Sequence, residues 1–249
     1  MASAPTPTVA PRRYRPRSYT NDLEEIVEDH LEEMLRVWDG SGGPWDEPGA
    51  RVPICGPWDE PGARVPICYL QQAVFDPLEM VDTGFSVPEA QRDRLASCHT
   101  PRDGKLEIVD KAASSEFNDG FEFLSGGGGL VSTLGDYAKF CQMFVDGGEF
   151  RGQRLLRRET LELMFTDQLN GIAGEFRFGL GFAINEVELG MGERARKALQ
   201  YSWGGYASTD FRIVPEERLV QVFLRQRVPS SHELANELFG IVYAGVGSD

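Results

Sequence analysis

The sequence has little that a metal site or a disulfide framework would need. It holds four cysteines and three histidines in 249 residues, and no Cys-x-x-Cys or His-x-x-x-His pair occurs. Four cysteines in a chain of this size do not form the dense framework of a small secreted domain. The histidines are scattered, so no zinc site is predicted and no cofactor is expected. These histidines are His30, His99 and His232.

Long apolar runs are absent too. No run of about 18 apolar residues exists to span a bilayer, and the first residues lack the apolar core of a signal peptide. A net charge of -14 argues against nucleic acid or anionic membrane as partners. These features favour a cytoplasmic protein. Residues 1–20, however, are rich in Pro and Arg and poor in acidic residues, so an organelle transit peptide is a second interpretation. The interpretation favoured for this segment is a disordered tail.

A hydrophobic content of 41% and 10% aromatic residues indicate a globular protein with one sizeable core. We assign residues 21–249 to this domain. Within it, Gly43–Cys55 and Gly56–Cys68 are identical 13-residue copies with three prolines each. Because proline interrupts helices and strand ladders, the tandem duplication at 43–68 is predicted to be a surface insertion.

Hydrophobic periodicity predicts helices separated by strands. Helices are expected at 21–36, 69–75, 89–96, 133–147, 158–169 and 232–246. Strands are expected at 106–109, 176–185, 199–206, 207–214 and 218–227, with 186–198 as a charged excursion. Strands in succession, closed by a helix, favour an α+β fold in which helices flank an antiparallel sheet.

The stretch from Tyr201 to Val214 is the most informative one. A tryptophan and two glycines lead into a strand in which Phe211 and Ile213 alternate with charged residues. Two explanations of the glycine pair stay open. Either the bare backbone of Gly204 and Gly205 allows a ligand to lie against it, or the pair marks a bulge or tight bend.

Four segments resemble the motifs of the β-lactamase-related serine hydrolases, which include class C β-lactamases, DD-peptidases and family VIII carboxylesterases. They occur in the family's order, over about residues 69–244. They are Asp76-Pro-Leu-Glu-Met-Val-Asp-Thr-Gly-Phe-Ser-Val-Pro88, Ser125-Gly-Gly-Gly-Gly-Leu-Val-Ser-Thr133 with Asp136 and Phe140, Phe178-Gly-Leu-Gly-Phe182, and Trp203-Gly-Gly205.

The resemblance implies an enzyme of small esters or amides that works through an acyl-serine. It puts Trp203 where β-lactamases carry the Lys of Lys-Thr-Gly, with Gly204 and Gly205 lining the substrate pocket. It makes the backbone N–H of Tyr206 an oxyanion donor. The Tyr19-Thr-Asn segment resembles the family's Tyr-x-Asn motif, whose tyrosine helps to move the nucleophile's proton.

The family's Ser-x-x-Lys nucleophile motif does not occur in this sequence. Its lysines are Lys105, Lys111, Lys139 and Lys197, and none has Ser or Thr three residues before it. We therefore expect a β-lactamase/DD-peptidase-like fold that is incomplete at its N-terminal side. The predicted function is that of an esterase-like serine hydrolase by descent, inactive as it stands. The alternative is a non-catalytic binding or interaction module, or a truncated gene product without activity of its own.

Overall fold

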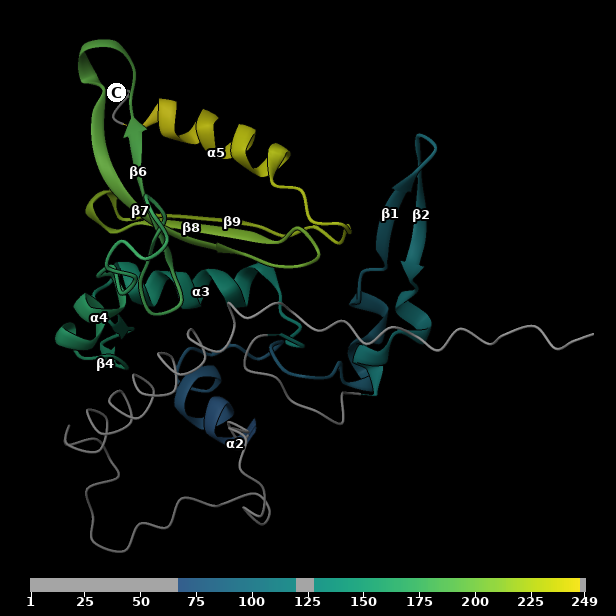
Figure 1. Cartoon of the computed structure of the whole chain (residues 1–249). Coiled ribbons are helices and arrows are strands. Elements are labelled where there is room, and N and C mark those ends of the chain that lie inside the picture. Colours follow the sequence, from purple (N-terminus) through teal and green to yellow (C-terminus); the bar gives the residue numbers. More distant parts are fainter. Residues whose placement is uncertain (1–66, 120–127, 247–249) are drawn as a thin grey trace, which may run out of the picture. The chain divides into compact units, whose positions relative to one another are not determined.

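The computed structural model describes residues 67–119 and 128–246 (Figure 1). All described residues belong to one compact unit. The predicted tail, the helix expected at 21–36, Tyr19 and the tandem repeat lie outside the described residues.

The described elements follow one another from a short helical segment to a long closing helix. The helical elements are α2 (Ile67–Leu70), η1 (Gln71–Phe75), η2 (Glu89–Arg94), η3 (Ala112–Ser114), η4 (Glu116–Asn118), α3 (Leu134–Val145), α4 (Arg158–Met164), η5 (Gly192–Arg194), η6 (Pro215–Glu217) and α5 (Glu233–Gly245). The strands are β1 (Cys98–Arg102), β2 (Lys105–Asp110), β3 (Glu149–Phe150), β4 (Gln153–Arg154), β5 (Arg177–Phe178), β6 (Ala183–Leu189), β7 (Arg196–Gly204), β8 (Asp210–Val214) and β9 (Leu219–Phe223).

Among the described residues, the main sheet has five strands in the order β5-β6-β7-β8-β9, all antiparallel to their neighbours. Helix α3 packs against one face of it, on β8 and β9, and α5 lies on the other face, against β6 (Figure 1). This arrangement confirms the predicted α+β class, with helices flanking an antiparallel sheet.

The face that α3 covers carries the larger hydrophobic core, in which aromatic rings pack edge to face. The ring centroids of Phe144 and Phe182 lie 4.9 Å apart, and those of Phe182 and Phe211 lie 5.8 Å apart. Tyr201 stacks on Phe165 at 3.9 Å. The opposite face has a smaller cluster of Leu189, Ala198, Val214 and Tyr243 beneath α5. The two sides of β7 therefore have different neighbours.

The prediction that residues 186–198 form a charged excursion is wrong at both ends of that range. Strand β6 runs to Leu189 and β7 begins at Arg196, and these two residues pair. The charged residues are compatible with strands because they alternate. Glu186 and Lys197 form an ion pair on one face, while Val187, Leu189 and Ala198 belong to the apolar cluster beneath α5.

The single strand predicted at 176–185 is also wrong, because β5 and β6 are separated by a tight turn. Gly179 N–H donates to the carbonyl of Phe182 at 2.8 Å, and Gly181 has φ +90°, a conformation that favours glycine. A Cβ on Gly179 would lie 2.0 Å from the carbonyl oxygen of Met164, so this glycine allows β5 to approach the end of α4.

Asp136 fastens the Asp76–Pro88 segment to α3. Its carboxylate, which is 3% exposed as a residue, accepts hydrogen bonds from the backbone N–H of Asp82 at 2.7 Å and the hydroxyl of Thr83 at 3.1 Å. It also pairs with Lys139 at 2.9 Å. Thr133 caps α3 by accepting from the N–H of Asp136, as its Thr-x-x-Asp spacing predicts. The first two motif segments are thus physically joined through one buried carboxylate.

Candidate functional site

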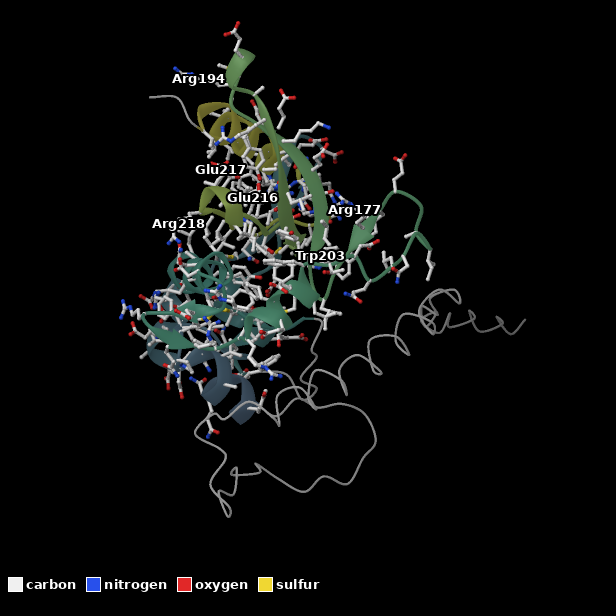
Figure 2. All side chains as sticks on the ribbon, turned by 90° about the vertical axis from the view of Figure 1, so that its left-hand side faces the viewer. Arg177, Arg194, Trp203, Glu216, Glu217 and Arg218 are labelled. Carbon is white, nitrogen blue, oxygen red and sulfur yellow. The ribbon has the colours of Figure 1, made fainter. Side chains whose placement is uncertain are left out.

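The C-terminal end of β7 projects beyond its partner strand. The pairing of β6 with β7 ends at Ala183 and Ser202, while β8 continues to pair with Trp203 and Gly204. The stretch that begins at Trp203 therefore has a strand neighbour on only one side among the described residues. Figure 2 shows Trp203 away from Glu216, Glu217 and Arg218, which belong to the turn at the other end of β8.

Trp203 is half exposed at this end of the strand, with 50% of its surface accessible. Its ring meets that of Phe178 at a centroid distance of 4.9 Å, edge to face, and Phe178 stacks on Phe176 at 6.0 Å. The structure thus brings the Phe178–Phe182 and Trp203–Gly205 motifs together, as an aromatic surface beside the free end of β7.

Each of the two glycines has a neighbour that leaves no room for a side chain. A Cβ on Gly204 would lie 2.6 Å from Cε1 of His232, and one on Gly205 would lie 2.2 Å from Oγ1 of Thr209. Gly205 N–H also donates to the carbonyl of Thr209 at 2.9 Å, which closes the turn between β7 and β8. The tight bend that the sequence left open as one explanation is therefore present.

Tyr206 lies in this turn, and 82% of the residue's surface is accessible. Its backbone N–H forms no hydrogen bond with any described residue. The turn is held from behind by Ser208, which is 1% exposed and donates its hydroxyl to the carbonyl of Arg227 at 2.7 Å. An unpaired N–H on an anchored turn is what an oxyanion donor requires, and the role of Tyr206 stays a prediction.

A cluster of ionisable groups borders the same strand end. Nδ1 of His232 lies 3.0 Å from Oδ2 of Asp210, whose side chain is 8% exposed. Asp210 also pairs with Arg212 at 3.4 Å, and Arg212 donates in turn to Oδ1 of Asn236. The guanidinium of Arg212 lies over the ring of Phe239, 4.3 Å from its centroid. Sequence analysis missed this cluster, because His232 and Asp210 meet only when α5 lies across the sheet.

A hollow of about 420 Å³ opens at this cluster. It is lined by residues of β6, β7, β8 and the start of α5. These are Ala183, Asn185, Val187, Gln200, Ser202, Trp203, Gly204, Asp210, Arg212, His232 and Asn236. A larger hollow of about 620 Å³ lies by the C-terminal end of α3 and by α4, and none of the predicted site residues lines it.

Two other ionisable groups, Cys141 and Tyr243, are buried in the interior of the protein. Burial raises the pKa of the Cys141 thiol to about 12, and Cys141 belongs to α3 and lies in the hydrophobic core. Burial likewise raises the pKa of Tyr243 to about 12, and its hydroxyl donates to Oε1 of Gln200 at 2.5 Å. Neither group has the lowered pKa of an activated nucleophile.

Within the described ranges, no serine hydroxyl is hydrogen-bonded to a lysine amine. Lys139 donates to Asp136 and to the carbonyl of Glu79, and Lys197 donates to Glu186. Nor do the described residues include a group of three or more His, Cys, Asp or Glu side chains that would hold a metal ion. No helix among them is long and apolar enough to cross a membrane.

Comparison with protein families decides the ancestry. The Beta-lactamase family model matches residues 67–242. The chain belongs to the Beta-lactamase family. The match contains all four motif segments, so their resemblance reflects descent, and Trp203, Gly204, Gly205 and Tyr206 lie in its C-terminal quarter. Tyr19 lies outside both the match and the described residues, and its role stays a prediction.

The proteins that this chain matches are longer than it is. Protein Rv1367c of Mycobacterium tuberculosis is 27% identical over an alignment of 177 positions, which covers 64% of this chain and 43% of that protein. Simvastatin synthase from Aspergillus terreus superposes with a TM-score of 0.55 at 23% identity, over 72% of this chain and 50% of that one. EstCE1, a hydrolase with promiscuous acyltransferase activity, gives 0.54 at 20% identity, over 70% and 49%. This chain therefore spans about half the length of the relatives it matches, and the structural likeness establishes the fold.

Proposed function

We propose that the chain is a serine hydrolase by descent. It keeps one wall of the ligand-binding site, formed by Trp203, Gly204, Gly205 and Tyr206, and it does not turn over substrate as it stands. The observation that carries the proposal is the free end of β7. There Trp203 is exposed beside Phe178, and the N–H of Tyr206 is unpaired among the described residues. A small ester or amide is the ligand that such a wall suits, with its carbonyl oxygen directed at that N–H.

The chemistry of acyl transfer explains why binding without turnover is expected. An oxyanion donor lowers the barrier only when a nucleophile attacks the carbonyl carbon, and the serine must lose its proton to a base as it attacks. The 249 residues contain no Ser-x-x-Lys, and no described serine lies in hydrogen-bonding contact with a lysine. Removing the nucleophile from such a unit lowers the rate by orders of magnitude, whatever remains of the wall.

The experiment uses the full chain of 249 residues with two reagents. A chromogenic short-chain ester should show no hydrolysis above the buffer rate, and a fluorophosphonate probe should label no serine. Binding is followed separately, through the NMR signal of the Trp203 indole N–H during titration with ethyl butyrate. The variant Trp203→Phe assigns that signal among the four tryptophans.

The two parts of the proposal fail separately. Labelling of any serine by the fluorophosphonate would contradict the lack of a nucleophile. Absence of a saturable shift at Trp203 would contradict ligand binding at the wall.

A second candidate is an interaction module that binds another polypeptide. It is favoured by the apolar stripe that α5 exposes along one side. Its members are Leu234, Leu238, Ile241 and Val242, with 43%, 41%, 65% and 43% of their surfaces accessible. Light scattering of the purified chain and a thermal melt test it. A monomer with a cooperative transition would argue against both a self-associating module and a truncated product without a fold of its own.

A further inference from the structure

The lining of the hollow beside α5 is more apolar than polar, and the two formal charges on it, those of Asp210 and Arg212, are opposite in sign. Asp210 and Arg212 pair with each other on this lining, and their side chains are 8% and 14% exposed. A charged ligand would therefore find no unpaired countercharge in this pair. The remaining polar groups on the lining are a hydroxyl, amides and one imidazole, from Ser202, Asn185, Gln200, Asn236 and His232.

The imidazole of His232 has its hydrogen-bonding direction fixed by Asp210. An ionised carboxylate only accepts hydrogen bonds, so the nitrogen 3.0 Å from Oδ2 of Asp210, Nδ1, carries the hydrogen. In the neutral ring Nε2 is then an acceptor. No described residue donates to Nε2, and the His232 side chain is 40% exposed. This nitrogen is available to a ligand O–H or N–H.

The amides around it supply the complementary groups. The Asn236 oxygen accepts from Arg212, which leaves its NH₂ group without a partner among the described residues. The Asn185 side chain forms no hydrogen bond with a described residue and is exposed on β6. Ser202 accepts from Gln200 and so retains its own hydrogen for donation. The lining thus offers the His232 Nε2 as an acceptor and the Asn236 amide and Ser202 hydroxyl as donors, together with the Asn185 amide and the ring of Trp203.

We infer that this hollow binds an uncharged molecule that carries several hydroxyl groups, a polyol or sugar. Each hydroxyl both donates and accepts, which matches neighbouring amides and an imidazole acceptor better than a carboxylate or an amine would. A volume of about 420 Å³ lies in the usual range of small-molecule sites, roughly 300–1,000 Å³. The site shares Trp203 and Gly204 with the proposed acyl-transfer wall, but binding there requires no nucleophile and does not rest on that function.

The test is an NMR titration of the full chain with methyl β-D-glucopyranoside at millimolar concentrations. We expect saturable shifts at the Trp203 indole and the His232 ring. The matched control ligand is the same glucoside with all hydroxyls methylated, which has the same ring but no O–H to donate, and it should give no saturable shift. Equal binding of the methylated glucoside would overturn the inference, as would the absence of any saturable shift with the parent sugar.

Two variants locate the site. Asn185→Ala removes an exposed amide with no described partner, so the fold should persist while the dissociation constant rises about tenfold, the loss expected for one good hydrogen bond. Gln153→Ala removes an exposed amide from β4, outside this hollow, and should leave the constant unchanged. An unchanged constant in Asn185→Ala would also overturn the inference. Absence of ester binding, or labelling of a serine by the fluorophosphonate, would contradict the proposed function and leave these results unaffected, so the two proposals are separable.

Discussion

Gly204→Ala tests whether the second residue of the Trp-Gly-Gly segment is glycine because of His232. The added Cβ would lie 2.6 Å from Cε1 and 3.3 Å from Nε2 of the imidazole. Gly204 does not have a positive φ, so alanine brings no backbone strain and the whole cost comes from this contact. Accepting the overlap costs about 1–3 kcal/mol. Moving the ring away instead gives up its hydrogen bond to the Asp210 carboxylate, which is worth about 1.5–3 kcal/mol when buried and less here, because the ring is 40% exposed. We expect a loss of about 1–2 kcal/mol in the free energy of unfolding.

The assay is urea denaturation of a double-mutant cycle formed by wild type, Gly204→Ala, His232→Ala and the double variant. In the His232→Ala background the added methyl enters empty space, so Gly204→Ala should cost under about 0.5 kcal/mol, the usual range for a tolerated surface change. Gly205→Ala is the matched control. Its Cβ would meet Thr209 instead, so His232→Ala should not rescue it. An equal loss from Gly204→Ala in both backgrounds would refute the reasoning.

Three further experiments examine other parts of the structure. Asp136→Asn should lower the free energy of unfolding by about 2–3 kcal/mol, since it weakens buried hydrogen bonds to a charge and the pairing with Lys139, and a change below about 0.5 kcal/mol in urea denaturation would contradict this. Gly179→Ala should cost more than Gly181→Ala in the same measurement, because its Cβ would meet a backbone carbonyl at 2.0 Å, whereas Gly181 has open space and only a φ of +90°, worth about 1–2 kcal/mol of strain. Burial raises the Cys141 pKa from 9.0 to about 12, so its contribution to stability is complete below pH 9.0 and is lost as the pH rises toward 12. Iodoacetamide at neutral pH should alkylate Cys141 only after denaturation, and peptide mass spectrometry would expose native labelling as the contrary result.

Hydrophobic periodicity was enough to predict the order of most elements. The helix expected to begin at Thr133 is α3, its cap is the predicted one, and the turn between β8 and β9 lies where the Val214–Arg218 sequence places it. These features depend on residues close in the chain, where capping and turn chemistry act directly.

The errors come from contacts between segments distant in sequence. Helix α4 was expected to reach Leu169 but ends at Met164, whose carbonyl accepts from the N–H of Leu180. No feature of the neighbouring sequence predicts that the Met164 carbonyl will accept from Leu180. The same limit applies to the site, because the pairing of His232 with Asp210 spans 22 residues and depends on how α5 crosses the sheet.

The sequence left two explanations of the glycine pair open, a ligand lying against the bare backbone or a tight bend, and the structure supports the tight bend. Since His232 and Thr209 already leave no room for side chains at Gly204 and Gly205, a bare backbone there is no sign of a ligand by itself. The case for a binding wall rests instead on two features of the described part of the chain: no strand pairs with Trp203 on one side, and no residue accepts a hydrogen bond from the N–H of Tyr206. The internal contact also has a chemical consequence. Because Gly204 has no side chain, the imidazole of His232 fits against its backbone, and the Nε2 acceptor of that ring lies on the same hollow as Trp203. His232 therefore both explains the glycine and gives this strand end a group that a hydroxyl can bind.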